Sequence, residues 1–421
     1  MSKIKIYNFG PIKQGYQDND GWIDVKKVTL FIGNQGSGKS TVAKLITTFL
    51  WIEKALTRGD YDKKWFTRKN KLKNQFLTYF RIDNYFPNVD DSNQPYIEYL
   101  GDSFHIVFEN GTLNIEEIKG KYYPLPQIMY VPAERNFISY VKNTKELKIA
   151  SDSLREFLAE FEKAKNEVKG SIKLPINDVD LEYDKLNDVL NIKGKVQNID
   201  YKVRLIDASS GFQSTVPLFL VSSYLANSVK NQSLKQSEPM SGDELDRFKK
   251  NAEEILSNNN LTYEQQRVAL SILSSKFNKT AFINIVEEPE QNLFPSSQRQ
   301  ILNKLLEFNN MNAGNKLIMT SHSPYLINYL THSVKASIVL EKIEKSNKKS
   351  ELKEKLNKVV PINSIIKPTD WVVYELNEAD GSIIKLDNYK DLPSDENYLN
   401  ESLGKSNDIF INLLELEDLC Q

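Results

Sequence analysis

Hydrophobic and polar positions divide the chain into short apolar runs and longer stretches with helical spacing. The apolar runs have the length and composition of strands and lie at 4–9, 22–33, 97–118, 127–136, 281–288 and 316–324. A glycine-rich turn after the second run is followed by an amphipathic pattern from about Ser40 to Ala55, which predicts a helix. Buried strands that alternate with helices predict an α/β fold with a mostly parallel sheet.

Several local patterns extend this prediction. Asn110-Gly111 inside the run 97–118 is typical of a hairpin turn, so we expect an antiparallel β-lobe at the front of the fold. Helices are expected at 151–168, at about 213–228 and from about 296, and a further hairpin is expected at 189–206. The tail predicts strands at 336–343, 371–376 and 382–386, and then a helix near 403–417.

Composition is that of a soluble globular protein, with 40% hydrophobic and 26% charged residues among 421. The formal net charge of −1 gives no overall field toward nucleic acid, so any such contact needs a local patch. The only cysteine, Cys420, excludes an internal disulfide and a cysteine-based zinc site and suits a reducing compartment. The start carries no apolar signal core, and the apolar stretch Val216–Leu225 is too short to cross a bilayer. We therefore expect a cytoplasmic protein without membrane contact.

The segment GNQGSGKS at 33–40 matches the phosphate-binding pattern G-x-x-x-x-G-K-[ST] between a strand and a helix. Its glycines let backbone N–H groups turn toward phosphate oxygens at a helix N-terminus. Lys39 is placed to bridge the β- and γ-phosphates, and Ser40 is placed to ligate Mg²⁺. The candidate ATP-binding residues are Gly33, Asn34, Gln35, Gly36, Ser37, Gly38, Lys39, Ser40 and Thr41. No N-K-x-D motif is present, which disfavours a GTPase.

Two later strand patterns end in candidate catalytic residues. FINIVEEPEQNLFP at 282–295 ends its apolar part in Glu287 and Glu288, which point to opposite sides of a strand and can take different roles. Glu287 is placed to hold Mg²⁺, and Glu288 is placed to orient and deprotonate an attacking water. KLIMTSHSPYL at 316–326 reaches its strand end at His322, which can hydrogen-bond a γ-phosphate or serve a purely structural role.

A small-residue turn, ASSGFQS at 208–214, precedes a predicted helix and offers a second anion site. Its candidate ligands are Ser209, Ser210, Gly211 and Gln213. Taken alone, this turn is typical of an ordinary helix cap.

These four segments, in this order, resemble the head of ABC ATPases: Walker A, signature, Walker B with a catalytic glutamate, and switch histidine. The resemblance implies that two copies pair head-to-tail and sandwich ATP and Mg²⁺, each signature covering the nucleotide held by the other copy. Three departures stand out: Phe212 replaces a usual glycine, Glu287 replaces a common aspartate, and PAER stands where a glutamine loop is usual. Glu134 and Arg135 are therefore the candidates for coupling the lobes.

In finer detail the chain resembles the AAA_15/AAA_21 group of stand-alone ATPases, and the segments that carry this resemblance are NFGPI, YVPAERN, SSGFQS, EEPEQNLFP and TSHSPYL. That group includes the ATPase part of OLD nucleases, PtuA of Septu and AriA of PARIS. The resemblance implies a slow ATPase that acts as sensor or scaffold for a separate effector, a nuclease or toxin, in anti-phage defence. The alternative is a RecF-like DNA-binding repair clamp.

The resemblance also implies one ABC-type domain over 1–421, with insertions at about 54–95, 137–200 and 229–279. The part 336–421 would complete the ATPase core and leave no room for a Toprim nuclease. The stretch 61–73 is basic with interleaved aromatics: Lys63, Lys64, Arg68, Lys69 and Lys71 could contact a phosphate backbone, with Trp65 and Phe66 stacking. A solvated or partner-docking face is the alternative and is commoner for such charge runs. The roles of this stretch and of 229–279 stay open.

Overall fold

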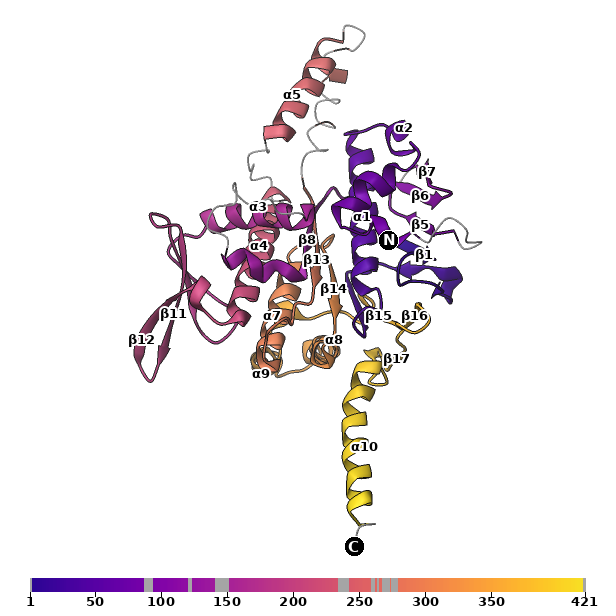
Figure 1. Cartoon of the computed structure of the whole chain (residues 1–421). Helices are drawn as coiled ribbons and strands as arrows, with labels where there is room; N and C mark the ends of the chain where they lie inside the picture. The colour runs from indigo at the N-terminus through magenta and orange to yellow at the C-terminus, as the bar shows by residue number, and fades with distance from the viewer. Residues whose placement is uncertain are drawn as a thin grey trace.

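The computed structural model of the chain (Figure 1) describes residues 2–86, 94–119, 123–140, 151–233, 242–258 and 279–418, together with 262, 265, 266 and 273. Its centre is a seven-stranded sheet. In spatial order the strands are β2 (Gly15–Tyr16), β16 (Ser382–Lys385), β15 (Trp371–Leu376), β4 (Val28–Gly33), β14 (Lys316–Ser321), β13 (Ala281–Glu287) and β8 (Pro126–Val131). The five strands from β15 to β8 run parallel, as expected for apolar strands buried on both faces. The predicted α/β class is confirmed.

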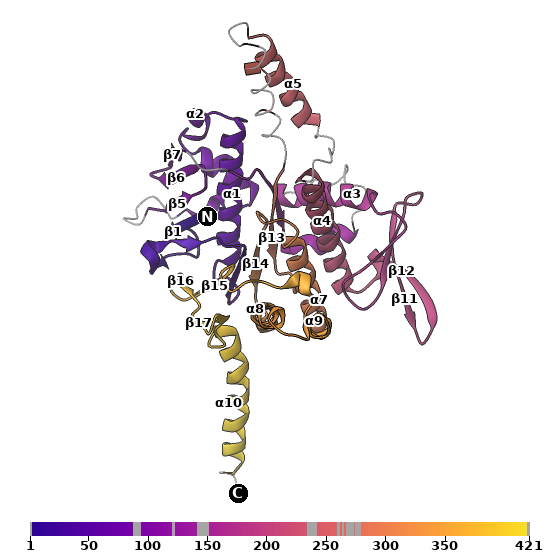
Figure 2. The same ribbon diagram turned by 180° about the vertical axis from the view of Figure 1, so that it is seen from behind.

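Alternate side chains of these strands enter two different hydrophobic cores. Leu30 and Ile32 of β4 pack in the core that contains the helices α4 (Ser210–Ser233), α7 (Pro295–Asn309) and α8 (Pro324–Glu344). Phe31 faces the opposite core, which contains α1 (Lys39–Arg58). Figures 1 and 2 show α1 on one side of the sheet and α4 and α7 on the other. The parallel strands therefore end along one edge of a layer that is covered on both faces.

A five-stranded antiparallel sheet packs on α1. Its spatial order is β3 (Ile23–Asp24), β1 (Lys3–Tyr7), β5 (Tyr96–Leu100), β6 (Phe104–Glu109) and β7 (Thr112–Glu117). Asn110 and Gly111 form the expected hairpin turn with φ of 50° and 77°. The buried carboxylate of Glu53 on α1 accepts hydrogen bonds from the Tyr99 hydroxyl at 2.7 Å and the Ser103 N–H at 2.7 Å, which ties helix to sheet. The expected front lobe is thus confirmed.

On the other side of the central sheet lies a lobe built from α3 (Asp152–Asn166) and a four-stranded antiparallel sheet. That sheet contains β9 (Ser171–Lys173), β10 (Asp180–Asp184), β11 (Val189–Val196) and β12 (Ile199–Arg204). Ser151 caps α3 by accepting a hydrogen bond from the Leu154 N–H at 3.4 Å. The helix α5 (Gly242–Leu256), within the segment 229–279, projects from the body (Figure 1), and much of that segment lies outside the described residues.

The tail contradicts one prediction. Residues 336–343, expected as a strand, belong to α8, because the buried positions Leu330, Val334 and Ser337 continue a spacing of three and four residues that is helical. The helix α9 (Lys349–Val359) follows, then β15 and β16, a hairpin of β17 (Asn388–Tyr389) and β18 (Leu392–Pro393), and α10 (Tyr398–Asp418). The strands at 371–376 and 382–386 and the terminal helix are confirmed.

Short helical segments complete the described chain: α2 (Lys63–Phe66), η1 (Asn19–Gly21), η2 (Leu72–Leu77), η3 (Asp83–Tyr85), η4 (Ala133–Tyr140), η5 (Leu205–Asp207) and η6 (Ile362–Ser364). Within the described residues, no helix has both the length and the apolar character that crossing a membrane requires.

Candidate functional site

The segment 33–40 forms a tight loop between β4 and the first turn of α1. Gly33, Gly36 and Gly38 have φ of 143°, 81° and 100°, conformations that side chains with a Cβ rarely adopt. A Cβ at Gly33 would lie 2.4 Å from the Leu376 carbonyl oxygen, so the backbone of the loop is held against β15. Asn34 and Gln35 are exposed on the outer turn, whereas Ser37 and Thr41 are buried. The loop therefore presents backbone N–H groups at a helix N-terminus, the arrangement that binds phosphate.

Lys39 lies beneath this loop, 5% exposed. Its ammonium donates hydrogen bonds to the carbonyl oxygens of Gly33 at 2.9 Å and Asn34 at 2.7 Å. Burial lowers the pKa of Lys39 from 10.5 to about 8, against the opposing effect of nearby carboxylates, chiefly Glu288. The positive charge of Lys39 is therefore only partly balanced by its surroundings, and a polyanion bound in the loop would stabilise it.

The strand register brings the acidic pair beside the loop. Glu287 pairs with Thr320 across β13 and β14, and Ser321 pairs with Ile32 across β14 and β4, so the three strand ends are neighbours. Glu287 is 4% exposed. Its Oε2 accepts a hydrogen bond from the Ala133 N–H at 3.2 Å, and its Oε1 has no hydrogen-bond partner of good geometry among the described residues. The buried Tyr130 hydroxyl lies close to this carboxylate, and burial together with the charge of Glu287 raises the pKa of Tyr130.

A buried carboxylate oxygen without a donor is the atom that a divalent cation would satisfy. Glu287 on β13 and the hydroxyl of Ser40 in the first turn of α1 therefore fit the Mg²⁺ that the sequence predicts. Mg²⁺ normally takes only one or two protein oxygens and completes its shell with water and phosphate.

Glu288 and His322 form a direct pair at the same edge. His322 Nε2 lies 3.1 Å from Glu288 Oε1, and His322 Nδ1 lies 3.2 Å from the Gly33 carbonyl oxygen. Glu288 has a positive φ of 44°, and its N–H donates to the Thr320 carbonyl at 3.0 Å, so its backbone turns out of the sheet. The hydrogen bond from His322 lowers the pKa of Glu288, although burial acts in the opposite direction. The carboxylate therefore stays ionised and can accept a hydrogen bond from a water molecule.

Sequence reasoning missed a second buried acid, Glu290. Its Oε1 accepts hydrogen bonds from the Ser321 hydroxyl at 2.7 Å and from the His322 N–H at 2.8 Å. Burial raises the pKa of Glu290, which is opposed by these two donors. Glu290 thus fixes the backbone from which the His322 ring extends, and the only signal in the sequence is a further acid two residues after the pair, in EEPEQ.

The turn at 208–214 begins α4 and is only partly exposed. Ser209 and Ser210 are exposed at its N-terminus, and a Cβ at Gly211 would lie 2.9 Å from the Asn292 carbonyl oxygen. The structure differs from expectation at Gln213, which is 4% exposed and donates hydrogen bonds to the carbonyls of Ile206 at 2.9 Å and Ala208 at 3.1 Å. Gln213 therefore shapes its own turn because its amide is already used inside the chain.

Arg135 joins that turn to the acidic pair. Its guanidinium is fully buried and donates to the carbonyls of Ser214 at 3.1 Å, Glu287 at 2.7 Å and Glu288 at 2.6 Å. Burial lowers the pKa of Arg135 to about 10, against the opposing effect of Glu290 and its acidic neighbours. Glu134, the other candidate for lobe coupling, is exposed. Only Arg135 of the two therefore contacts both α4 and the end of β13.

The structure thus brings Lys39, Glu287, Glu288 and His322 to one edge of the sheet. Between the described residues, no hydrogen bond joins Ser209 or Ser210 to the phosphate loop.

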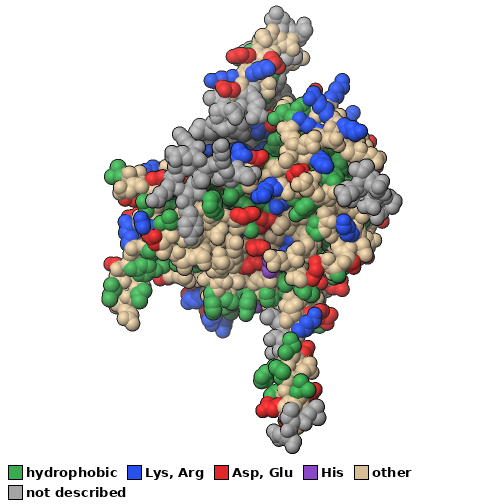
Figure 3. All heavy atoms as spheres, in the orientation of Figure 1, with side chains coloured by type: hydrophobic (Ala, Val, Ile, Leu, Met, Phe, Trp, Pro, Cys, Tyr) green, Lys and Arg blue, Asp and Glu red, His purple; other side chains and the backbone are tan. Residues whose placement is uncertain are grey.

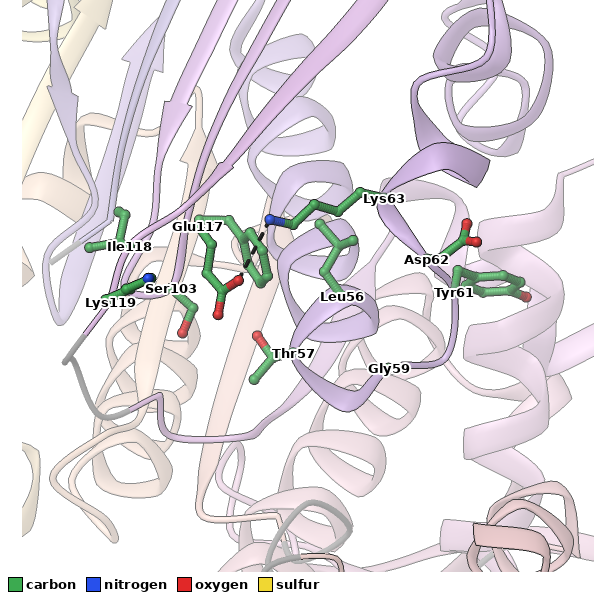
Figure 4. A pocket seen from close by; sticks show the side chains of 11 residues that line it. Leu56, Thr57, Gly59, Tyr61, Asp62, Lys63, Ser103, Glu117, Ile118 and Lys119 are labelled. Atoms are coloured by element: carbon green, nitrogen blue, oxygen red, sulfur yellow. Dashed lines mark ion pairs between the residues drawn. The ribbon is translucent and has the colours of Figure 1, made fainter. Parts of the chain in front are cut away.

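The basic stretch 61–73 lies elsewhere. Phe66 is fully buried, and Trp65 is stacked on Tyr61 with ring centroids 4.1 Å apart, so Phe66 is not available to stack on bases and that expectation is corrected. A nearby cavity of about 670 Å³ lies at the C-terminal end of α1, where Lys63 pairs with Glu117 at 3.6 Å. Figure 4 shows the side chains that line it. Because the phosphate loop is at the opposite end of this 20-residue helix, about 30 Å away, the cavity is not part of the nucleotide site.

Comparisons with known proteins give only distant similarities. No protein-family model matches the chain, and no curated protein does. Among solved structures, the SMC head domain from Thermotoga maritima aligns over 92% of this chain and 98% of its own at 10% identity, with a TM-score of 0.37. An SMC head from Pyrococcus furiosus bound to the C-terminal domain of ScpA aligns over 98% and 100% at 11% identity, with a TM-score of 0.34.

A dimeric ATP-binding cassette with ADP and phosphate aligns over 92% of this chain and 100% of its own at 11% identity, with a TM-score of 0.30. With TM-scores below 0.5, these similarities by themselves assign no function to the chain.

Proposed function

We propose that this chain binds and hydrolyses ATP with Mg²⁺. The observation that carries the proposal is the position of His322 between the Gly33 carbonyl of the phosphate loop and the carboxylate of Glu288. A catalytic base, a phosphate-sensing imidazole and a phosphate-binding loop are thereby held within hydrogen-bond reach of one another. If the two acids only marked the end of a strand in solvent, they would not require a histidine placed between the carboxylate and the loop.

Each residue has a distinct part in the proposed reaction. The loop N–H groups and Lys39 bind the β- and γ-phosphates, and the buried position of Lys39 makes its charge more effective there. Ser40 and Glu287 would hold Mg²⁺, which would supply positive charge beside the phosphate oxygens. Glu288, ionised beside His322, orients a water in line with the γ-phosphate and accepts its proton.

The hydrolysis step is tested with three variants. Lys39→Ala should abolish nucleotide binding, measured with a fluorescent ATP analogue. Glu288→Gln should retain binding and lower phosphate release by about 10²- to 10⁴-fold, the usual contribution of a general base. Glu354→Gln, an exposed acid paired with Lys358 on α9, is the control and should hydrolyse at the wild-type rate. Unchanged turnover in Glu288→Gln contradicts the assignment.

We further propose that the site is completed by a second copy. Ser209 and Ser210 are exposed at the N-terminus of α4, which supports an anion contact in trans rather than within the chain. Co-expression of Lys39→Ala with Ser210→Glu tests this, because copies that assemble together form mixed pairs, and a mixed pair has one intact site that combines the loop of one copy with the turn of the other. Neither variant should hydrolyse ATP alone, and the equimolar co-expressed protein should regain about a quarter of wild-type activity. A co-expressed protein that stays inactive contradicts the shared site.

We also propose, from the resemblance of the motifs, that the ATPase is a sensor or scaffold for a separate effector in anti-phage defence. Recovery of a nuclease or toxin with the Glu288→Gln protein tests this role. The RecF-like alternative is favoured by one observation: Lys64, Arg68 and Lys69 are exposed near α2, where Figure 3 shows basic side chains gathered. It requires ATP-dependent DNA binding that weakens steeply with salt.

A further inference from the structure

The helix α10 leaves the body of the molecule after its first turn and extends into solvent (Figures 1 and 2). At its start the Tyr398 N–H donates to Glu375 Oε2 at 2.8 Å, and Leu399 is buried. Beyond that turn, six large apolar side chains are 45–62% exposed: Ile409, Phe410, Ile411, Leu413, Leu414 and Leu416. A projecting helix of this length gains no stability from packing on its own chain.

Five of them, Ile409, Phe410, Leu413, Leu414 and Leu416, are linked by spacings of three and four and form one stripe along the helix, here called the α10 stripe. Asp408 and Glu415 lie on the opposite side of the helix, and Glu417, four residues after Leu413, lies at the C-terminal end of the stripe. Green side chains follow α10 in the space-filling view of Figure 3. An amphipathic helix without a partner on its own chain is a surface for helix–helix association.

The place where α10 begins indicates what covers the stripe. Glu375, which anchors it, pairs with Ile32 across β15 and β4, one residue before the phosphate loop. The helix therefore starts at the same edge of the sheet at which the proposed function brings in a second copy. Its stripe exposes about 500 Å² of apolar surface, taking about half of each large side chain. A stable interface buries about 800 Å² on each partner, so the stripe supplies a large part of that area.

We propose that the α10 stripe pairs with the α10 stripe of a second copy of this chain. The inference rests on the proposed head-to-tail function and deepens it. The paired helices hold two copies together without nucleotide, so closure of the heads around ATP becomes an intramolecular event with a high effective concentration. ATP then changes the arrangement of the pair and not its mass.

The test compares Leu413→Glu with Ile411→Glu. Both changes remove an exposed apolar side chain and add one negative charge, but Leu413 lies at the centre of the stripe, whereas Ile411, 50% exposed, lies about 160° from Leu413 around the helix. Mass is measured by sedimentation of the full chain without nucleotide. Wild type and Ile411→Glu should be dimers, whereas the dissociation constant of Leu413→Glu should rise at least about hundredfold, because the change occurs in both copies. Circular dichroism should show that both variants fold.

Three outcomes overturn the inference: a wild-type chain that is monomeric without nucleotide, a Leu413→Glu dimer as tight as wild type, or equal weakening by Ile411→Glu. Binding of α10 to a different protein while the chain alone stays monomeric also overturns it. Failure of the shared ATP site is separate, because it appears in the co-expression of Lys39→Ala with Ser210→Glu. Lys39→Ala itself should remain dimeric, since its α10 is intact.

Discussion

Raising the pH should weaken ATP binding in a range where an ordinary lysine remains fully charged. The perturbed group is Lys39, whose pKa burial lowers from 10.5 to about 8, with Glu288, Glu290, Glu378 and Glu287 opposing this decrease. If only the ammonium form binds the triphosphate, the apparent dissociation constant rises as the protonated fraction falls. That fraction drops from about 0.8 at pH 7.5 to about 0.1 at pH 9, so affinity should decrease about eightfold.

The same shift predicts a change in stability without nucleotide. Because the folded pKa lies below the unfolded one, the unfolded chain binds more protons between pH 8 and 10.5, and stability must rise with pH in that window. Below pH 8, burial of the charged Lys39 ammonium destabilises the folded state by about 3 kcal/mol, and this destabilisation disappears as Lys39 loses its proton. Relative to Lys39→Met, the wild-type free energy of unfolding should gain about 1 kcal/mol from pH 7.5 to 9.

Two assays read these effects independently. Titration with a fluorescent ATP analogue at pH 7.5, 8, 8.5 and 9 gives the affinity, and urea unfolding of wild type and Lys39→Met gives the stability difference. Phosphates are fully ionised over this range, so the ligand does not contribute a titration of its own. An affinity that is constant to pH 9, together with a constant stability difference, would refute the reasoning that burial beneath the loop lowers the pKa of Lys39.

Three further predictions concern the groups around the acidic pair. Arg135→Lys should lower the free energy of unfolding by about 3 kcal/mol in urea titration, because buried carbonyls lose their donors, whereas Arg155→Lys on the exposed face of α3 should have little effect. Gly211→Ala should lower the melting temperature and slow ATP hydrolysis, since its Cβ meets the Asn292 carbonyl at 2.9 Å, at a cost of about 1–3 kcal/mol. Glu290→Ala should cost about 2 kcal/mol by calorimetry, because the Ser321 hydroxyl and the His322 N–H lose their acceptor, and Glu290→Gln should cost clearly less.

Local and strand-order signals were sufficient to predict which residues meet at one edge of the sheet. Lys39 lies in a motif whose glycines require positive φ, and Glu288 and His322 each follow a buried apolar strand, so neighbouring parallel strands bring them together. The tail prediction failed at 336–343, where β-branched residues suggested a strand but the helical spacing of buried positions decides the structure.

The remaining features could not be predicted because they depend on contacts between distant segments. Arg135 donates to carbonyls on α4 and at the end of β13, and nothing near it in the sequence identifies these partners. Gln213 matched the position of a ligand in trans, but its amide is used by two carbonyls of its own turn. In both cases the hydrogen-bond requirement of buried backbone groups determines where the side chain lies.

The contacts around Glu288 also suggest why completion of the site by a second copy would matter for hydrolysis. Arg135 binds the carbonyl of Ser214, in the first turns of α4, and the carbonyl of Glu288, while the carboxylate of Glu288 binds His322, which contacts Gly33. A ligand that moves the start of α4 must therefore also move the guanidinium of Arg135, which donates a hydrogen bond to the backbone carbonyl of Glu288. Because a buried guanidinium cannot release one carbonyl without finding another acceptor, a shift of α4 and a shift of Glu288 are energetically coupled. Loss of this coupling in Arg135→Lys should therefore reduce turnover more than it reduces ATP affinity.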